Sequence, residues 1–489
     1  MTNERTVVFT VNGVRLHSAY NPQAEAERFV SSLEAPFLPK AVIVTEPALS
    51  YIAEPLKKRF PGIPVCAIRY SESFKDVDSY FTQVFYGKEK SLAEELFSYF
   101  GEETLSASLF VSWQPSAKAF PKEDENVWEE IKKAVLKSRD VLATRTYFSK
   151  RWAKNAVRFC ALIKTQAFPQ KTDSPVIICA SGPSLTPSLP LIKKNRNRAI
   201  VLALSSAVSP LKKEGIVPDM ILSTDGGYWA KAHLRECHFA FREVPLALSA
   251  ESACPSKLLL EHAVVPLSYG DGISESLIKE SGIKALQAER NGTVSGTAAC
   301  LALKLSTGPI FFCGLDLSPS SGKVHAEPNQ NENRDSLRDM KLCTKETRLT
   351  PSHFASPSLD LYASWFRSRN FNGRIFRLSL GSKYKNSFPN IPDVDWNFFE
   401  KTCTAPVKPL AFSFTGSEKE NTNRIKDLEQ ILDDHRADPV WQKDAFPALC
   451  ILRERSISGE QKAQYESQIN KESEKLNGEL KALLAGGHP

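Results

Sequence analysis

Short apolar runs alternate with amphipathic segments through the middle of the chain. The runs are bounded by turn residues, which is typical of buried strands. Segments of helical period, such as 208–214 and 293–306, lie between them. Buried strands that alternate with helices predict an α/β fold with a mostly parallel sheet and helices on both faces. The predicted strands are 176–180, 199–205, 219–224, 245–249, 264–268 and 309–315.

The flanking regions have different patterns. A hairpin is expected around Asn12-Gly13, and an apolar run at 41–44, a helix at 50–60 and a strand at 65–68 predict a smaller α/β unit. Helical periodicity extends over 128–168, and a charged helical pattern covers 420–484. We therefore expect four parts: an N-terminal α/β domain (1–140), a helical connector (141–174), a central Rossmann-like domain (175–395) and a helical C-terminal region (396–489).

Composition narrows the class of protein. The 489 residues are 42% hydrophobic and 24% charged, as in ordinary globular proteins. The net charge of +7 comes without a dense Lys/Arg stripe, which argues against a nucleic-acid partner. The ten cysteines form no C-x-x-C pair, which favours a reducing cytoplasm over a zinc site. The chain has neither an N-terminal signal pattern nor an apolar run of membrane-spanning length, so no membrane span is expected.

Small or acidic residues follow several predicted strands. Ser181-Gly182-Pro183-Ser184 comes after the first, Ser205 after the second, Asp225 after the third, Ser249 and Glu251 after the fourth, and Asp316 after the last. Ligands of open parallel sheets bind at this carboxyl edge. Backbone N–H groups where a strand turns into a helix attract phosphate, although Ser181–Ser184 is equally compatible with an ordinary turn. Asp225 and Asp316 are candidates for binding hydroxyls, a base or a metal, or for capping a turn.

Two further segments add candidate chemistry. Ser295, Gly296 and Thr297 begin a helix of small residues, where they either line a ligand or permit close packing. His325 and His353 lie in polar loops after the last strand, where an imidazole is suited to general base chemistry; a solvated loop position is the alternative. The sequence lacks metal-protease and P-loop motifs and the dinucleotide glycine pattern, so we expect no metal site.

The sequence resembles the motility accessory factor (Maf) family of flagellin glycosyltransferases in several segments. These are Ser-Gly-Pro-Ser-Leu at 181–185 and the segments 200–209, 215–225, 293–316 and 323–326. Asn21-Pro22 and the segment 25–29 are similar to the N-terminal domain of that family. The central domain also resembles the MptE-like 6-hydroxymethylpterin pyrophosphokinases and the bacterial CMP-sialic-acid sialyltransferases. The resemblance covers most of residues 10–380.

The resemblance implies an inverting cytoplasmic glycosyltransferase that needs no cofactor. It would transfer a nonulosonic (sialic-like) sugar from a CMP donor to Ser or Thr of flagellin and so support flagellum assembly and motility. In this interpretation the N–H groups of Gly182–Ser184 bind the donor phosphate and Ser295–Thr297 line the cytidine. Asp225 and Asp316 position donor hydroxyls or the base. His325 matches the histidine of the motility family, and His353 matches the sialyltransferase base.

Two alternatives stay open. The first is pyrophosphoryl transfer from ATP to a hydroxymethylpterin, with Mg²⁺ held by Asp225 and Asp316. The second is a non-catalytic flagellin-binding module, because Ser181 stands where the sialyltransferases have an asparagine that can contact phosphate.

Overall fold

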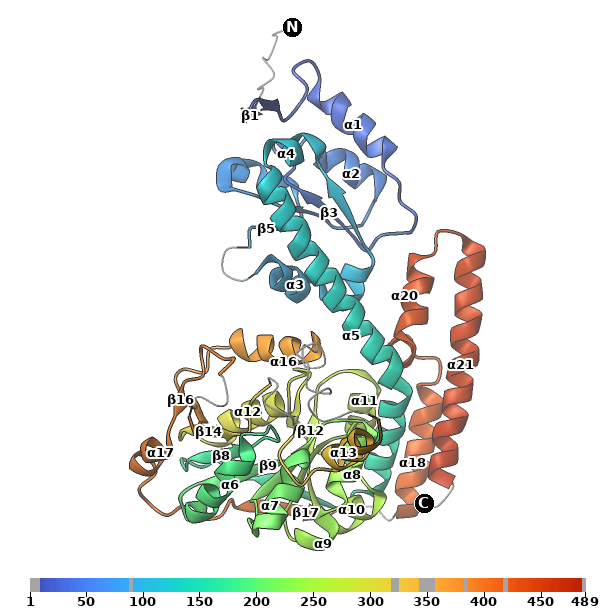
Figure 1. Ribbon diagram of the computed structural model, residues 1–489. Coiled ribbons are helices and arrows are strands. Elements are labelled where there is room, and N and C mark those ends of the chain that lie inside the picture. The colour runs from blue at the N-terminus through green and yellow to red at the C-terminus, as the bar shows by residue number, and fades with distance from the viewer. Residues whose placement is uncertain are drawn as a thin grey trace. The chain divides into compact units, whose positions relative to one another are not determined.

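The computed structural model describes residues 9–87, 91–317, 325–342, 357–381, 386–416 and 421–485. The chain forms two compact units (Figure 1). Unit 1 comprises Met1–Ser149 and Gln442–Glu474, and unit 2 comprises Lys150–Trp441 and Lys475–Pro489. The four-part division expected from the sequence stays a prediction.

Unit 1 contains a four-stranded parallel sheet with the order β5-β4-β3-β6. Successive residues of its central strands face opposite sides, so two separate cores form. One core packs under α1 and α2, and the other under α3 and α5. The predicted hairpin is confirmed as β1 (Thr10–Val11) and β2 (Val14–Arg15). The other elements are β3 (Ala41–Thr45), β4 (Val65–Ile68), β5 (Val84–Phe85), β6 (Ser108–Ser112), α1 (Pro22–Ser32), α2 (Ala53–Arg59), α3 (Leu92–Ser106), α4 (Gln114–Ala119) and α5 (Pro121–Leu162).

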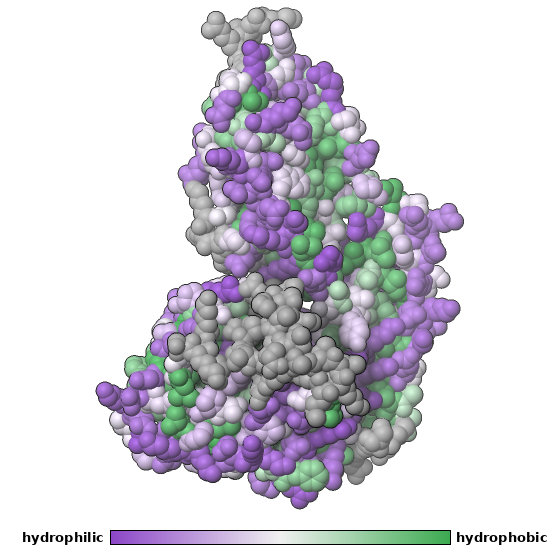
Figure 2. Space-filling model, viewed as in Figure 1, coloured by the Kyte–Doolittle hydropathy of each residue, from purple (hydrophilic) through white to green (hydrophobic). Residues whose placement is uncertain are grey.

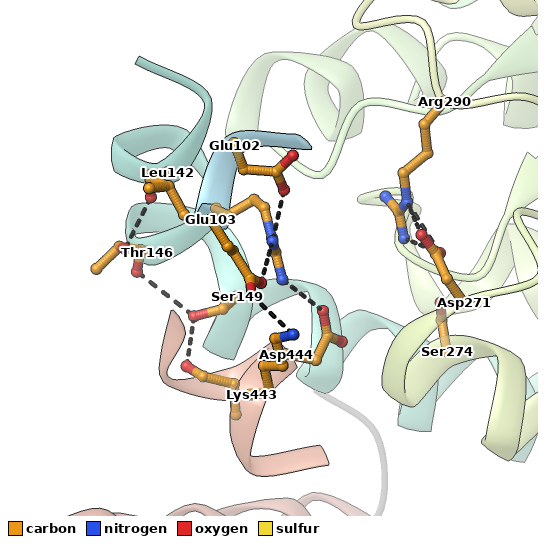
Figure 3. A network of polar contacts seen from close by, with 12 residues as sticks. Glu102, Glu103, Leu142, Thr146, Ser149, Asp271, Ser274, Arg290, Lys443 and Asp444 are labelled. Atoms are coloured by element: carbon orange, nitrogen blue, oxygen red, sulfur yellow. Dashed lines mark hydrogen bonds and ion pairs between the residues drawn. The ribbon is translucent and has the colours of Figure 1, made fainter. Parts of the chain in front are cut away.

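C-terminal helices complete unit 1. The Arg145 guanidinium on α5 donates to Glu102 at 2.6 Å and to Glu103 at 3.0 Å, and Lys443 pairs with Glu103 at 2.7 Å (Figure 3). The Ser149 hydroxyl donates to the carbonyl oxygen of Ala445 at 2.8 Å. Segments far apart in the sequence therefore share one network. The helices are α19 (Pro439–Ala445), α20 (Pro447–Arg455) and α21 (Gly459–Ala485).

Unit 2 is built on a large sheet whose pairs are all parallel except the pair of β17 with β7. The mostly parallel sheet expected from the sequence is therefore confirmed, with strand bounds within a few residues of the predicted ones. In spatial order the strands are β16 (Asp393–Val394), β15 (Ile375–Leu378), β14 (Ile310–Cys313), β8 (Val176–Cys179), β9 (Ile200–Leu204), β10 (Met220–Ser223), β11 (Leu246–Ser249), β12 (Ala263–Ser268), β7 (Thr165–Pro169) and β17 (Phe412–Gly416), with β13 (Leu286–Gln287) also paired to β12.

Helices cover both faces of this sheet. The ring of Phe312 meets Phe366 of α16, with 6.0 Å between centroids, whereas its neighbour Phe311 meets Phe399 of α17 at 5.0 Å. Because adjacent residues of a strand point to opposite faces, both faces are covered. The helices are α6 (Leu185–Lys194), α7 (Val208–Glu214), α8 (Tyr228–Leu234), α9 (Cys237–Ala240), α10 (Ser256–Glu261), α11 (Gly272–Glu280), α12 (Val294–Leu305), α13 (Gln330–Leu342), α16 (Pro357–Arg367), α17 (Trp396–Thr402) and α18 (Asn421–Asp434).

The helix predicted through residue 168 is wrong over its last residues. Helix α5 ends at Leu162, and Thr165–Pro169 instead form β7 between β12 and β17. Pairing on both sides satisfies the backbone of β7, which outweighs the helical pattern. The charged C-terminal region is helical as predicted, from Asn421 onward.

Hydrophilic residues cover much of the described surface of unit 2 that is visible in Figure 2. Among the described residues, no helix is both long and apolar enough to span a membrane.

Candidate functional site

The carboxyl ends of the parallel strands of unit 2 meet at one edge of the sheet. Strand β8 lies between β14 and β9, and β10 and β11 follow, so the loops after these strands are neighbours. Adjacent strands are about 4.8 Å apart. The candidate residues after β14, β8 and β9 therefore form one cluster, and those after β10 and β11 form a second beside it.

The turn after β8 is built around Asp316. The Asp316 carboxylate accepts the N–H of Ser184 at 2.9 Å and its hydroxyl at 2.6 Å. A Cβ on Gly182 would lie 2.4 Å from this carboxylate, so glycine permits the close approach. Nη1 of Arg377 is 3.6 Å from Oδ1 of Asp316, the oxygen that accepts the Ser184 hydroxyl. Burial raises the pKa of Asp316, and the Ser184 hydrogen bonds oppose that rise.

This geometry corrects the expected role of the Gly182–Ser184 backbone. The N–H of Gly182 donates to the carbonyl oxygen of Gly314 at 2.8 Å, that of Ser184 donates to Asp316, and Pro183 has none. No N–H of these three residues is left for a phosphate. The reason is that the Asp316 carboxylate occupies the start of α6, where a helix favours an anion. Asp316 is only 3% exposed and stabilises the turn from inside.

His325 lies beside the same turn. The N–H of Ala326 donates to the carbonyl oxygen of Ser181 at 2.8 Å, which joins the His325 segment to the end of β8. The Glu332 carboxylate accepts the backbone N–H of His325 at 2.9 Å and lies 3.5 Å from its Nδ1. The imidazole and the buried carboxylate are thus close, although Nδ1 of His325 makes no hydrogen bond within the described residues. His353, the other predicted base, lies outside the described residues.

Serines after β9 complete the first cluster. The Ser206 hydroxyl donates to the Ser181 hydroxyl at 2.8 Å, so the residue that replaces asparagine has a partner within the protein. Ser205 is buried at the first position of the turn that precedes α7. The structure thus brings together Ser181, Gly182, Pro183, Ser184, Ser205, Asp316 and His325.

The second cluster contains the start of α12. Thr293 caps this helix, because its hydroxyl oxygen accepts the N–H of Gly296 at 2.8 Å. A Cβ on Gly296 would lie 2.7 Å from the Asn291 side chain, so this glycine permits close packing within the turn. Ser295 and Thr297 are buried in the first turn of the helix.

Asp225 is exposed at the end of β10, near the α12 turn. Its carboxylate accepts the N–H of Gly227 at 2.7 Å, which closes a tight turn. Burial, together with the Asp225 charge, raises the pKa of Tyr362, whose ring lies 3.2 Å from a Cβ placed on Gly292. Tyr362 therefore lies near both Asp225 and Gly292 at the edge of the sheet.

Arg290 and Asp271, which with Glu251 join the loops of the second cluster, were not predicted from the sequence. The Arg290 guanidinium donates to Glu251 at 2.6 and 2.9 Å and to Asp271 at 2.8 Å (Figure 3 shows the Asp271 contact). It also lies 4.4 Å from the centroid of the Tyr269 ring. The signal available in the sequence was an arginine directly before Asn291-Gly292, the turn that opens the predicted helix.

The two predicted carboxylates do not fit one Mg²⁺ site. Asp225 follows β10 and Asp316 follows β14, and both β8 and β9 lie between these strands. Three inter-strand steps amount to roughly 14 Å, whereas ligands of Mg²⁺ lie about 2 Å from the ion. The described residues contain no group of three or more His, Cys, Asp or Glu that could hold a metal ion.

A cavity of about 430 Å³ lies at the opposite, amino edge of the sheet. It contains none of the predicted site residues, and it begins where β9 and β10 begin. Its lining residues are Lys193, Lys194, Arg196, Asn197, Ala199, Asp219, Val407, Lys408 and Pro409.

Comparisons with known proteins agree with the resemblance expected from the sequence. Residues 150–322 match the family model described as 6-hydroxymethylpterin diphosphokinase MptE-like. A Maf glycosyltransferase structure from Magnetospirillum magneticum AMB-1 superimposes with a TM-score of 0.53 at 14% identity, covering 99% of this chain and 91% of that one. The expectation of a Maf-like fold with an MptE-like central domain is thereby confirmed.

Two proteins of Treponema pallidum (strain Nichols), both described as uncharacterized, are similar in sequence. One is 28% identical over 283 residues, which are 57% of this chain and 61% of the relative. The other is 25% identical over 141 residues, which are 28% of this chain and 65% of the relative. The chain therefore spans less than two thirds of the length of each.

Proposed function

We propose that this protein is an inverting glycosyltransferase that transfers a nonulosonic sugar from a CMP donor to Ser or Thr hydroxyls of flagellin in the cytoplasm. The Maf-like fold supports the class of enzyme. The observation that carries the proposal is the position of His325 beside the Ser181 turn, with Glu332 against its imidazole. Such a pair is suited to removing a proton from an acceptor hydroxyl.

The proposed reaction is a single displacement. The acceptor oxygen forms a bond to the anomeric carbon of the sugar while the bond from that carbon to the phosphate oxygen breaks. The histidine takes the hydroxyl proton, and CMP leaves with the electron pair of the broken bond. Glu332 would stabilise the imidazolium that results. His353 remains the second candidate for this base.

We place the donor across the two clusters. Its nucleoside portion would lie at the start of α12, where Ser295, Gly296 and Thr297 begin the helix, and Asp225 would accept donor hydroxyls. The Ser181–Ser184 turn would form a wall of the pocket. Because Asp316 already occupies the start of α6, its role in this proposal is to hold that wall.

The test is release of CMP. The purified chain is incubated with a CMP-nonulosonate, with and without flagellin, and CMP and modified flagellin are measured. Flagellin-dependent CMP release is expected. His325→Ala and His353→Ala identify the base: loss of the true base reduces turnover at least a hundredfold and leaves CMP binding intact. No CMP release with any nonulosonate would overturn the proposal.

One specific observation supports a second candidate, because residues 150–322 match the MptE-like model. In that case the chain would transfer pyrophosphate from ATP to a hydroxymethylpterin and release AMP. The separation of Asp225 from Asp316 weighs against the Mg²⁺ ligands expected for it. Incubation with ATP, Mg²⁺ and the pterin decides this case through AMP release. Flagellin binding without either product would indicate a non-catalytic module.

A further inference from the structure

Arg290 joins loops that follow several strands of unit 2. Its guanidinium contacts Glu251 after β11 and Asp271 after β12. The Asn155 amide donates to the carbonyl oxygen of Glu251 at 2.9 Å. Gly226, after β10, packs so closely that a Cβ there would lie 3.0 Å from the same carbonyl oxygen. The ion pairs of Arg290 thus connect the loops that follow the neighbouring strands β11 and β12.

The two acidic partners of Arg290 differ in burial. The Glu251 side chain is 6% exposed and also accepts the Ser274 hydroxyl at 2.9 Å, whereas the Asp271 side chain is 57% exposed. Removing one partner of a buried pair leaves the other charge uncompensated, while an exposed pair contributes little. The contact with Glu251 therefore holds Arg290 in place, and Asp271 provides a matched control on the same guanidinium.

Arg290 is followed directly by the turn that begins α12. The Asn291 side chain accepts the N–H of Thr293 at 3.1 Å and fills the space beside Gly296. Thr293 in turn caps Gly296. The backbone that leaves Arg290 therefore determines where the Asn291 side chain and the helix cap lie.

We propose that Arg290, held by Glu251, is a positioning residue that fixes the Asn291–Thr293 turn and so prepares the first turn of α12 for the nucleoside portion of the donor. This inference rests on the proposed function for the identity of the ligand. The fixing of the turn by the ion pair does not depend on it. Neither Arg290 nor Glu251 is assigned a contact with reacting atoms.

The test compares Glu251→Gln and Arg290→Lys with Asp271→Asn in the full chain. Lysine keeps the charge but cannot bond two carboxylates in the planar geometry of a guanidinium. Two measurements are made below the melting temperature of every variant: the dissociation constant of CMP and amide hydrogen exchange of a peptide covering 288–299. We expect Glu251→Gln and Arg290→Lys each to raise the dissociation constant of CMP at least tenfold. We also expect both variants to speed the amide exchange of this peptide at least tenfold. Asp271→Asn should stay within about twofold of the wild type.

Three other results would contradict part of the inference or all of it. Unchanged exchange of the 288–299 peptide in Glu251→Gln and Arg290→Lys overturns the inference, and so does exchange that rises evenly over all of unit 2. Unchanged CMP affinity with faster local exchange overturns the link to the ligand, because a merely structural pair would behave in this way. If the wild type binds no CMP, the proposed donor is wrong and the exchange measurement alone decides the role of Arg290.

Discussion

At the scale of single residues, Asp316 shows how a side chain can replace the ligand that a motif predicts. A strand that turns into a helix through small residues favours an anion at the helix start. Here the anion is internal, since Asp316 accepts both the N–H and the hydroxyl of Ser184. The motif alone does not reveal this, because the carboxylate comes from a distant strand end that the sheet brings beside it.

Replacing Asp316 by asparagine is expected to lower the free energy of unfolding by about 2 kcal/mol, because the amide cannot accept both Ser184 donors and no longer faces Arg377 as a charge. Urea denaturation followed by circular dichroism measures the change. Asp225→Asn is the control, since that carboxylate is exposed, and its effect should stay within about 0.5 kcal/mol. Equal losses in the two variants would contradict the internal role of Asp316.

His17 in unit 1 predicts a dependence of stability on pH. Burial lowers the pKa of His17 from 6.5 to about 4, and its Nε2 accepts the N–H of Leu49 at 3.0 Å. Because the pKa of the folded state lies below that of the unfolded state, the stabilisation is complete above pH 6.5 and is lost as the pH falls toward 4. The loss amounts to about 3 kcal/mol at the lower limit.

The measurement is urea denaturation of the wild type and His17→Gln between pH 7.5 and 4.5. Glutamine keeps an acceptor for Leu49 but does not titrate, so the variant should lose less stability over this range. His233 in unit 2 has its pKa lowered in the same direction by burial, and its contribution should persist in both proteins. An identical pH dependence of the two proteins would show that His17 is not responsible.

At the scale of elements, the turn between β8 and α6 has no room for a side chain at Gly182. A Cβ on Gly182 would lie 2.4 Å from Asp316 and 2.5 Å from the carbonyl oxygen of Gly314. We expect Gly182→Ala to lower the free energy of unfolding by about 2–3 kcal/mol, because the backbone at Gly314 must move to make room for the new methyl group. Thermal unfolding tests this, with Gly459→Ala as the control, since a Cβ at Gly459 meets nothing within 4 Å. A melting temperature for Gly182→Ala equal to that of the control would disprove the close fit.

The elements also show what the sequence could and could not predict. The strands β8 to β12 and β14 were predicted because each is a local apolar run with turn residues at its ends. Strand β7 was missed because its partners β12 and β17 are far along the chain, and pairing with them keeps Thr165–Pro169 extended. The pair of Arg290 with Glu251 was missed for the same reason, since side chains 39 positions apart meet only after the sheet forms.

At the scale of the whole molecule, unit 1 is completed by Gln442–Glu474, which come after the long first segment of unit 2 in the sequence. A chain that ends at Trp441 would lack Gln442–Glu474, and with it the contacts of Ala445 with Ser149 and of Lys443 with Glu103. It would also lose the buried side chains of Cys450, Ile451 and Ile469. This chain would also lack Lys475–Pro489 of unit 2, including the buried Leu476 and Leu480. Because unit 1 loses the longer segment, we expect residues 1–149 of the truncated chain to become more sensitive to proteases than Lys150–Trp441.

Limited proteolysis with mass spectrometry measures this difference. A chain that ends at Ala485 is the control, because it keeps all of Gln442–Glu474 and should resist cleavage in both units. Protection of residues 1–149 in the chain that ends at Trp441 would show that unit 1 folds without its C-terminal part.

The same discontinuity has a consequence for biosynthesis. A ribosome that has finished Ser149 must still translate all of Lys150–Trp441 and then Gln442–Glu474 before unit 1 has its last segment. At typical elongation rates this interval is on the order of tens of seconds. During that time Glu103 and Ser149 lack Lys443 and Ala445, their partners in the finished fold, so unit 1 is completed only after most of unit 2 has been made.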